Sequence, residues 1–126
     1  MKREVKMILI LGGEASGKRT FARSLGYKDT DMTREITSPL PVFFQLEKVI
    51  RENPSIADDS LIEFLCQKQL VLCCEVGSGV IPVEREERVA REMIGRTCIR
   101  LAQRADIVIR MVAGIPTVIK GHLGTG

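Results

Sequence analysis

Aromatic residues are scarce in this chain, which has 126 residues, no tryptophan, one tyrosine and four phenylalanines. Proteins that bind single-stranded nucleic acid stack bases on aromatic side chains, and the sequence shows no such platform. The formal net charge of +3 is also too small to indicate nucleic acid by itself. The composition therefore gives no support to nucleic-acid binding.

Long hydrophobic runs are absent as well. No apolar run approaches the roughly 20 residues that a membrane-spanning helix needs. A short apolar run follows Lys2, Arg3 and Lys6, but it is rich in β-forming residues and lacks the small-residue cleavage site of a secretory signal. We therefore expect a cytoplasmic protein with one domain over residues 1–126 and a loose tail at 121–126.

Metal-binding patterns of cysteine and histidine are missing too. The four cysteines show no C-x-x-C spacing, and the one histidine is His122, near the end of the sequence. Cys73 and Cys74 are adjacent in an expected strand, so their side chains should point to opposite faces. We expect free thiols in a reducing compartment rather than a metal site or a disulfide framework.

What the sequence does contain is a glycine-rich loop between an expected strand and an expected helix. The apolar run Val5 to Leu11 precedes GGEASGK (Gly12 to Lys18), an order typical of a phosphate-binding P-loop. Its glycines let the backbone wrap so that successive N–H groups point into one concavity, next to the positive end of a helix. Lys18 adds a charge for the β- and γ-phosphates. The predicted nucleotide-binding residues are Gly12, Gly13, Glu14, Ala15, Ser16, Gly17, Lys18, Arg19 and Thr20.

One position departs from the P-loop pattern. A serine or threonine normally follows the lysine and binds Mg²⁺, but Arg19 stands there and Thr20 comes next. A shift of one residue turns a helical side chain by about 100°, so Thr20 is expected to point away, although it is the remaining hydroxyl candidate. Arg19 either adds permanent charge beside a phosphate or faces solvent.

The rest of the chain alternates apolar strands with amphipathic helices. This predicts an α/β fold, a P-loop NTPase-like three-layer sandwich with a mostly parallel sheet. A short Gly-x-Pro turn before the last strand predicts an antiparallel hairpin at the C-terminal edge. The segment Tyr27 to Pro41 is expected to be a long loop with a short extended piece. Strands are expected at 5–11, 70–74, 107–112 and 117–120, and helices at 42–52, 55–68 and 84–104, with Ser55 and Asp58 forming a capping box and Val89 facing inward.

Glu75 is the acid that this fold should bring near the loop. Ligands of such sheets bind outside the carboxyl ends of the strands, where Glu75 and the loop are both expected. We predict a catalytic role for Lys18 and Glu75, with Glu75 positioning Mg²⁺ through water. The alternative is an acid that ends a strand and accepts loop N–H groups. Arginines 96, 100 and 104 form a stripe, which is either a solvated face or a subunit or nucleotide contact.

Several stretches resemble the adenosylcobinamide kinase/adenosylcobinamide-phosphate guanylyltransferase family of cobalamin synthesis. They are the GGEASGK loop, EVGSGVIP (Glu75 to Pro82), the pairs Ala90-Arg91 and Gly95-Arg96, and RADIVIRMVAGIPTVIK (Arg104 to Lys120). The resemblance implies a P-loop α/β fold, ATP or GTP as substrate with Mg²⁺, phosphoryl transfer to a hydroxyl of adenosylcobinamide, and a homo-oligomer. Candidate substrate contacts in these stretches are Gly77, Ser78, Gly79, Pro82 and Arg96.

The sequence also differs from that family. Guanylyl transfer there uses a histidine nucleophile in the central region, which here contains no histidine. Cys98 and Ile99 replace an asparagine-glutamine pair. We therefore expect a kinase-like protein without guanylyltransferase activity. The alternative is a catalytically silent nucleotide-binding module that regulates or assembles with another protein.

Overall fold

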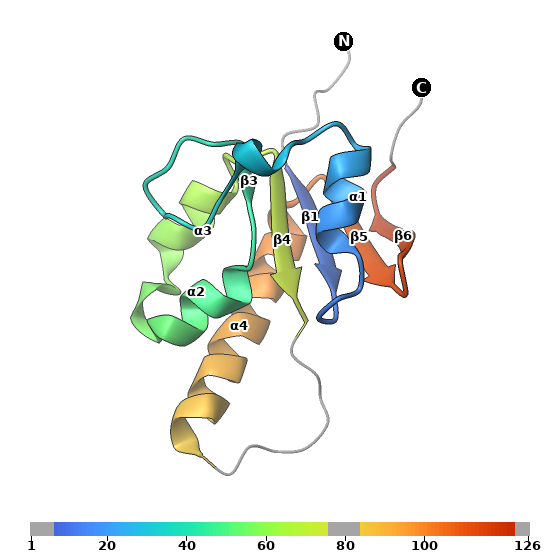
Figure 1. Cartoon of the computed structure of the whole chain (residues 1–126). Coiled ribbons are helices and arrows are strands. Elements are labelled where there is room, and N and C mark those ends of the chain that lie inside the picture. The colour runs from blue at the N-terminus through green and yellow to red at the C-terminus, as the bar shows by residue number, and fades with distance from the viewer. Residues whose placement is uncertain (1–6, 76–83, 123–126) are drawn as a thin grey trace.

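A six-stranded sheet forms the centre of the computed structural model, which describes residues 7–75 and 84–122 (Figure 1). The strand order is β2-β3-β4-β1-β5-β6. The first five strands of this order run parallel, and β6 is antiparallel to β5 at the edge. This confirms the expected α/β fold, the mostly parallel sheet and the C-terminal hairpin. The strands are β1 Ile8–Gly12, β2 Met32–Thr33, β3 Val42–Phe43, β4 Leu70–Cys74, β5 Ile107–Val112 and β6 Ile115–Lys120.

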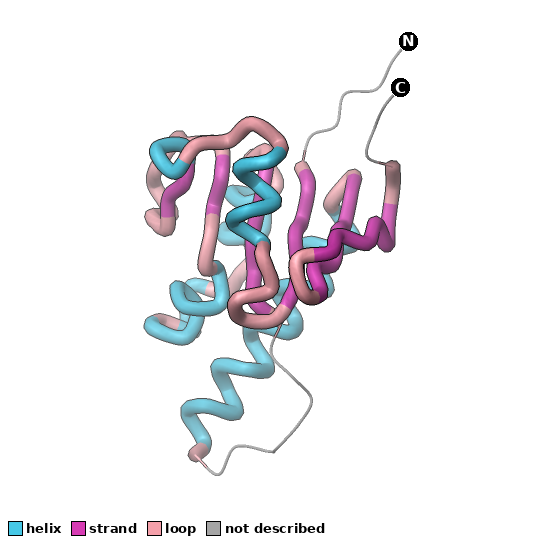
Figure 2. Tube along the Cα trace, turned by 45° about the vertical axis from the view of Figure 1, so that its right-hand side comes forward, coloured by secondary structure: helices cyan, strands magenta, loops and turns pink. Residues whose placement is uncertain are grey.

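Helices cover both faces of this sheet (Figures 1 and 2). One face packs against α2 (Leu46–Glu52), α3 (Asp59–Leu65) and α4 (Arg85–Arg104) through a core that includes Leu9, Val71 and Ile94. The other face packs against α1 (Lys18–Ser24), where Ala22 joins strand residues such as Ile10 and Leu72. Strands covered on both faces need apolar side chains at successive positions, which explains the uninterrupted apolar runs.

Strand register decides where the carboxyl ends of the strands meet. Gly12, the last residue of β1, is aligned with Cys74 at the end of β4 and with Met111 in β5. The loop after β1 therefore begins between the ends of its two neighbouring strands. This is the edge at which parallel α/β sheets bind ligands.

The segment Val42 to Glu52 differs from its expected form. Val42–Phe43 is a strand that pairs with both β2 and β4, and the helix begins only at Leu46. The spacing of Leu46 and Ile50 correctly predicts a helix, but the predicted N-terminal bound is too early. A two-residue strand has too little pattern to be detected. Its partner β2 is the extended piece expected between Tyr27 and Pro41.

The start of α3 also differs. Asp58 is the N-cap itself and accepts a hydrogen bond from the Leu61 amide at 3.0 Å, while Ser55 lies in a 3₁₀ turn, Pro54–Ile56. The helix ends at Leu65 rather than near Lys68. The expected capping box of Ser55 and Asp58 is therefore wrong, because Asp58 rather than Ser55 caps the helix start.

The long helix α4 has nearly the predicted bounds, but Val89 is 40% exposed instead of inward-facing. The arginine stripe on this helix is engaged in ion pairs, within α4 or with α3.

β6 begins at Ile115, two residues earlier than expected, and includes Pro116. An edge strand tolerates proline because one side of it has no partner strand. All four cysteines are free, as expected, with Cys73 Sγ 3.4 Å from Cys98 Sγ.

Residues 1–6, 76–83 and 123–126 lie outside the described residues. The predicted tail 121–126 is therefore described only at its first two positions. No helix among the described residues is long and apolar enough to cross a membrane.

Candidate functional site at the loop Gly12–Lys18

The loop between β1 and α1 is a tight turn with left-handed backbone at two positions. Ala15 has φ 58° and Gly17, the residue before the helix, has φ 97°. The Ser16 amide donates to the Gly13 carbonyl at 3.2 Å, which closes the turn. A Cβ on Gly12 would lie 2.4 Å from Ser16 Oγ and 2.7 Å from the Met111 carbonyl oxygen. Glycine at position 12 is therefore required by the close approach of backbone and loop.

Most of the loop amides remain free to bind a ligand. Apart from that of Ser16, the N–H groups from Glu14 to Arg19 donate to no backbone acceptor in the described part of the chain. Successive free amides in a turn with left-handed residues form a concavity that attracts anions. The loop thus combines left-handed backbone at Ala15 and Gly17 with unpaired amides, which are two features of an anion-binding turn.

Lys18 folds back over this loop. Its ammonium donates to the carbonyls of Gly13 at 2.7 Å and Gly12 at 3.2 Å, and it lies 3.5 Å from Ser16 Oγ. These acceptors are neutral, so a phosphate oxygen would form a stronger, charge-assisted bond with the same ammonium. Lys18 is therefore held beside the loop in a position from which it can pair with an anion.

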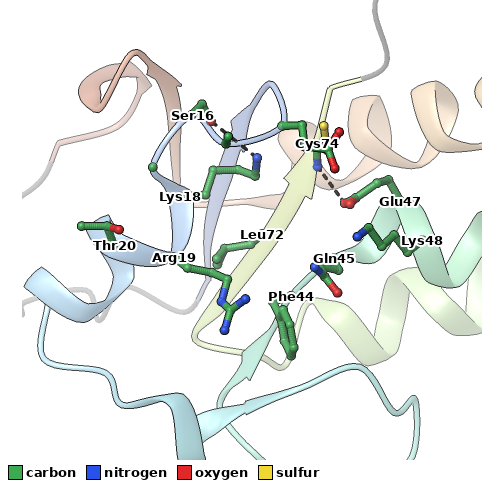
Figure 3. A pocket seen from close by; sticks show the side chains of 13 residues that line it. Ser16, Lys18, Arg19, Thr20, Phe44, Gln45, Glu47, Lys48, Leu72 and Cys74 are labelled. Carbon is green, nitrogen blue, oxygen red and sulfur yellow. Dashed lines mark hydrogen bonds between the residues drawn. The ribbon is translucent and has the colours of Figure 1, made fainter.

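A cavity of about 340 Å³ adjoins the loop (Figure 3). It lies between α1, the end of β4 and the segment that joins β3 to α2. Its volume is within the range of small-molecule sites, at the lower end. The lining residues are Glu14, Ala15, Ser16, Gly17, Lys18, Arg19, Thr20, Phe44, Gln45, Glu47, Lys48, Leu72 and Cys74.

Glu47 is a buried acid in this cavity that the sequence did not suggest. Its side chain comes from α2, the residue is 7% exposed, and Oε1 accepts a hydrogen bond from the Cys74 amide at 2.9 Å. Buried carboxylates are rare unless partnered and often mark sites. A prediction that included β3 would have placed Glu47 near the ligand-binding edge of the sheet, because Glu47 follows the end of that strand by four residues.

Glu75 lies beside the loop but not in the same cavity. Its amide donates to the Gly12 carbonyl at 2.8 Å, and its carboxylate pairs with Arg110 at 3.1 Å. It lines a second hollow of about 280 Å³ that shares only Glu14, Ala15 and Ser16 with the first. Sequence reasoning placed Glu75 correctly at a strand end. It did not foresee the ion pair, because the pairing depends on β5 lying two strands away across β1.

The structure separates the two residues expected to hold Mg²⁺, because Thr20 and Glu75 line different hollows. Figure 3 shows Thr20 lying apart from Lys18, although both line the first cavity, while Glu75 pairs with Arg110 in the other hollow. The residue after Lys18 is Arg19, whose guanidinium lies 5.1 Å from the centre of the Phe44 ring. Among residues 7–75 and 84–122, no three His, Cys, Asp or Glu side chains are grouped to bind a metal. Mg²⁺ at phosphate sites is usually held by one or two carboxylates together with substrate phosphates and water, and the expected carboxylate, Glu75, lies in the other hollow.

Arg96, the one predicted substrate contact among the described residues, is not at the site. Arg96 lies on α4, its guanidinium pairs with Glu92, and it lines neither hollow. Its place in the sequence gave no sign that α4 packs on the face opposite α1. Gly77, Ser78, Gly79 and Pro82 lie outside the described residues.

Cys74, a further residue of the cavity wall, is not suited to act as a nucleophile. Burial raises the pKa of its thiol, and the nearby Lys18 charge opposes this shift without cancelling it. A thiol rather than a thiolate is therefore present near neutral pH.

Comparison with known proteins supports the fold only. No family model matches the sequence, and neither does any curated protein. The flagellar accessory protein FlaH from Methanocaldococcus jannaschii has a similar structure, with a TM-score of 0.53 and 12% identity over 93% of this chain and 79% of that chain. A protein of Pyrococcus horikoshii OT3 aligns over 94% of this chain and 75% of its own, with 10% identity and a TM-score of 0.36. The FlaH likeness agrees with an α/β architecture built on a mostly parallel sheet.

Proposed function

We propose that this protein is a P-loop protein that binds the phosphates of ATP or GTP in the loop Gly12–Lys18. One observation carries the proposal, namely that the Lys18 ammonium and a row of free loop amides border a single cavity. Permanent positive charge and converging N–H donors are what a polyphosphate chain requires. The position of the loop, between the carboxyl ends of neighbouring parallel strands, supports the same ligand.

The reaction we propose is phosphoryl transfer from this nucleotide to the hydroxyl of a small molecule. Lys18 and the loop amides would stabilise the charge on the transferring group. Glu47 lies in the same cavity, and its carboxylate is suited to orient an accepting hydroxyl. The sequence resemblance makes adenosylcobinamide the first acceptor to test, in a cytoplasmic protein that forms a homo-oligomer.

A catalytically silent nucleotide-binding module is the second candidate. Two observations favour it, since Arg19 replaces the expected hydroxyl and Glu75 is paired with Arg110 instead of facing the cavity. Such a protein would hold nucleotide tightly and transmit its presence to a partner without turning it over.

Calorimetric titration with ATP and with GTP tests the shared part of both candidates. We expect Lys18→Ala to weaken binding by at least about tenfold, because a charge-assisted hydrogen bond contributes about 1.5–3 kcal/mol. Lys28→Ala is the matched control, since Lys28 is exposed and lines neither hollow. Equal affinity of Lys18→Ala and the unchanged protein would refute binding at the loop.

Product analysis separates the two candidates. The protein is incubated with ATP, Mg²⁺ and adenosylcobinamide, then with a panel of other small alcohols, and the products are examined by mass spectrometry. A phosphorylated acceptor establishes the kinase and excludes the silent module. Tight nucleotide binding without any product supports the module instead.

A further inference from the structure

The cavity beside the loop is lined by three cationic side chains. Lys18 and Arg19 come from the start of α1, and Lys48 comes from α2 (Figure 3). Neither Arg19 nor Lys48 forms an ion pair with a carboxylate within residues 7–75 and 84–122. Most described arginines elsewhere in the molecule, such as Arg100 and Arg104 on α4, do form such pairs. The two unpaired charges at the cavity are therefore available to an anionic ligand.

Arg19 is held in place on the wall of this cavity. Its guanidinium lies 5.1 Å from the centre of the Phe44 ring, within the range of a cation–π contact. A guanidinium that stacks on an aromatic ring by its face keeps its in-plane N–H donors free for an oxygen ligand. Because Arg19 is exposed, this contact contributes only modestly to keeping the guanidinium on the cavity wall.

Glu14 and Glu47 line this cavity and Glu75 lies near it, but within residues 7–75 and 84–122 no three acids are grouped to bind a metal. Glu75 points into the other hollow, toward Arg110. Glu47 faces the cavity, but one of its oxygens already accepts the Cys74 amide. An arginine also occupies the position after the lysine, where a metal-binding hydroxyl is expected. A cation bound there would meet the three like charges of Lys18, Arg19 and Lys48, which outnumber the carboxylates of Glu14 and Glu47.

We propose that the cavity binds the triphosphate chain free of divalent metal, with Arg19 and Lys48 in place of Mg²⁺. Their two formal charges equal that of one Mg²⁺ ion, and both line the cavity that Lys18 borders. This inference rests on the proposed nucleotide binding and specifies the ionic form of the nucleotide that the site takes. Free triphosphate is the more highly charged form, so it gains more from the three cations that line the cavity than the metal complex does.

The test compares affinities for ATP, and for inorganic tripolyphosphate as a probe of the phosphates alone, in excess EDTA and in excess Mg²⁺. We expect the unchanged protein to bind both at least as tightly in EDTA as in Mg²⁺. Arg19→Ser removes the charge and supplies the missing hydroxyl. It is expected to weaken binding in EDTA by at least about tenfold and to make binding stronger in Mg²⁺ than in EDTA. Lys48→Ala is expected to weaken binding in EDTA as well.

Two further variants control for folding and for packing against Phe44. Arg34→Ser removes the other guanidinium near that ring, 5.8 Å from its centre, and Arg34 does not line the cavity, so its affinity in EDTA should stay within about twofold. Arg19→Lys keeps the charge and is expected to retain metal-free binding. Equal thermal midpoints across the set confirm that the variants are folded.

The outcomes also separate this inference from the nucleotide-binding proposal. If the unchanged protein binds nucleotide only in Mg²⁺, the inference is overturned and the nucleotide-binding proposal stands. Loss of this Mg²⁺-dependent binding in Glu47→Gln would then identify Glu47 as the metal ligand. Equal affinities of Arg19→Ser and the unchanged protein in EDTA also overturn it. Absence of binding in both buffers refutes nucleotide binding itself.

Discussion

The amide of Gly114 donates a hydrogen bond to the carbonyl oxygen of Ser16 at 2.9 Å. Gly114 is at the tip of the hairpin between β5 and β6, and Ser16 is in the loop that follows β1. A Cβ on Gly17 would lie 3.2 Å from the Gly114 Cα, so the two turns are in close contact. The edge hairpin therefore supports the candidate anion-binding loop from a distant part of the sequence.

Because the hairpin contacts the loop, we expect Gly114→Ala to disturb the loop and lower nucleotide affinity, although Gly114 itself is not a predicted ligand contact. Gly114 has φ 78°, and alanine there costs about 1–2 kcal/mol because of its left-handed backbone. The midpoint of thermal unfolding should fall, and nucleotide affinity should fall severalfold. Gly95→Ala in α4 is the control, because its Cβ would meet open space and alanine favours a helix by about 0.5–1 kcal/mol. An unchanged midpoint for Gly114→Ala would contradict the supporting role.

Gly12 and Gly13 are adjacent, yet their alanine variants should behave differently. A Cβ at position 12 would meet the Met111 carbonyl oxygen at 2.7 Å, and backbone cannot easily move aside. We expect Gly12→Ala to destabilise the protein by about 1–3 kcal/mol and to distort the loop. A Cβ at position 13 has no neighbour within 4 Å, so Gly13→Ala should change stability little. Chemical denaturation of both variants measures the difference, and equal losses would show that the Gly12 contact is unimportant.

The pair of Glu63 and Arg104 predicts a dependence of stability on pH. The hydrogen bond and the charge of Arg104 lower the pKa of Glu63 in the folded protein. A lowered carboxyl pKa stabilises the fold above the ordinary pKa of glutamate, and this stabilisation is lost as the pH falls through the folded value. The thermal midpoint of Glu63→Gln should therefore lie below that of the unchanged protein at pH 7, and the gap should close in acid. A gap that is constant down to pH 2 would rule out this origin.

The sequence was most informative where a pattern was long or chemically unusual. The apolar run of β4 predicted its bounds correctly, and the charged, periodic segment of α4 was placed within one residue. The loop Gly12–Lys18 was recognised from its glycines, since only a few residue types permit such a turn. The segment Val42 to Phe44 failed because two strand residues beside a helix show no period of their own.

The roles of individual acids depended on contacts between distant segments. Glu75 and Arg110 are 35 positions apart, and nothing local in the chain indicates that they pair. Glu47 likewise reaches the Cys74 amide only because α2 packs against the end of β4. The sequence by itself determined the four longer strands, the helices that follow them and the glycine-rich loop, because backbone preferences and apolar periodicity act locally. Only the tertiary structure decided which charges face the cavity, because that depends on strand order and on the faces that the helices cover.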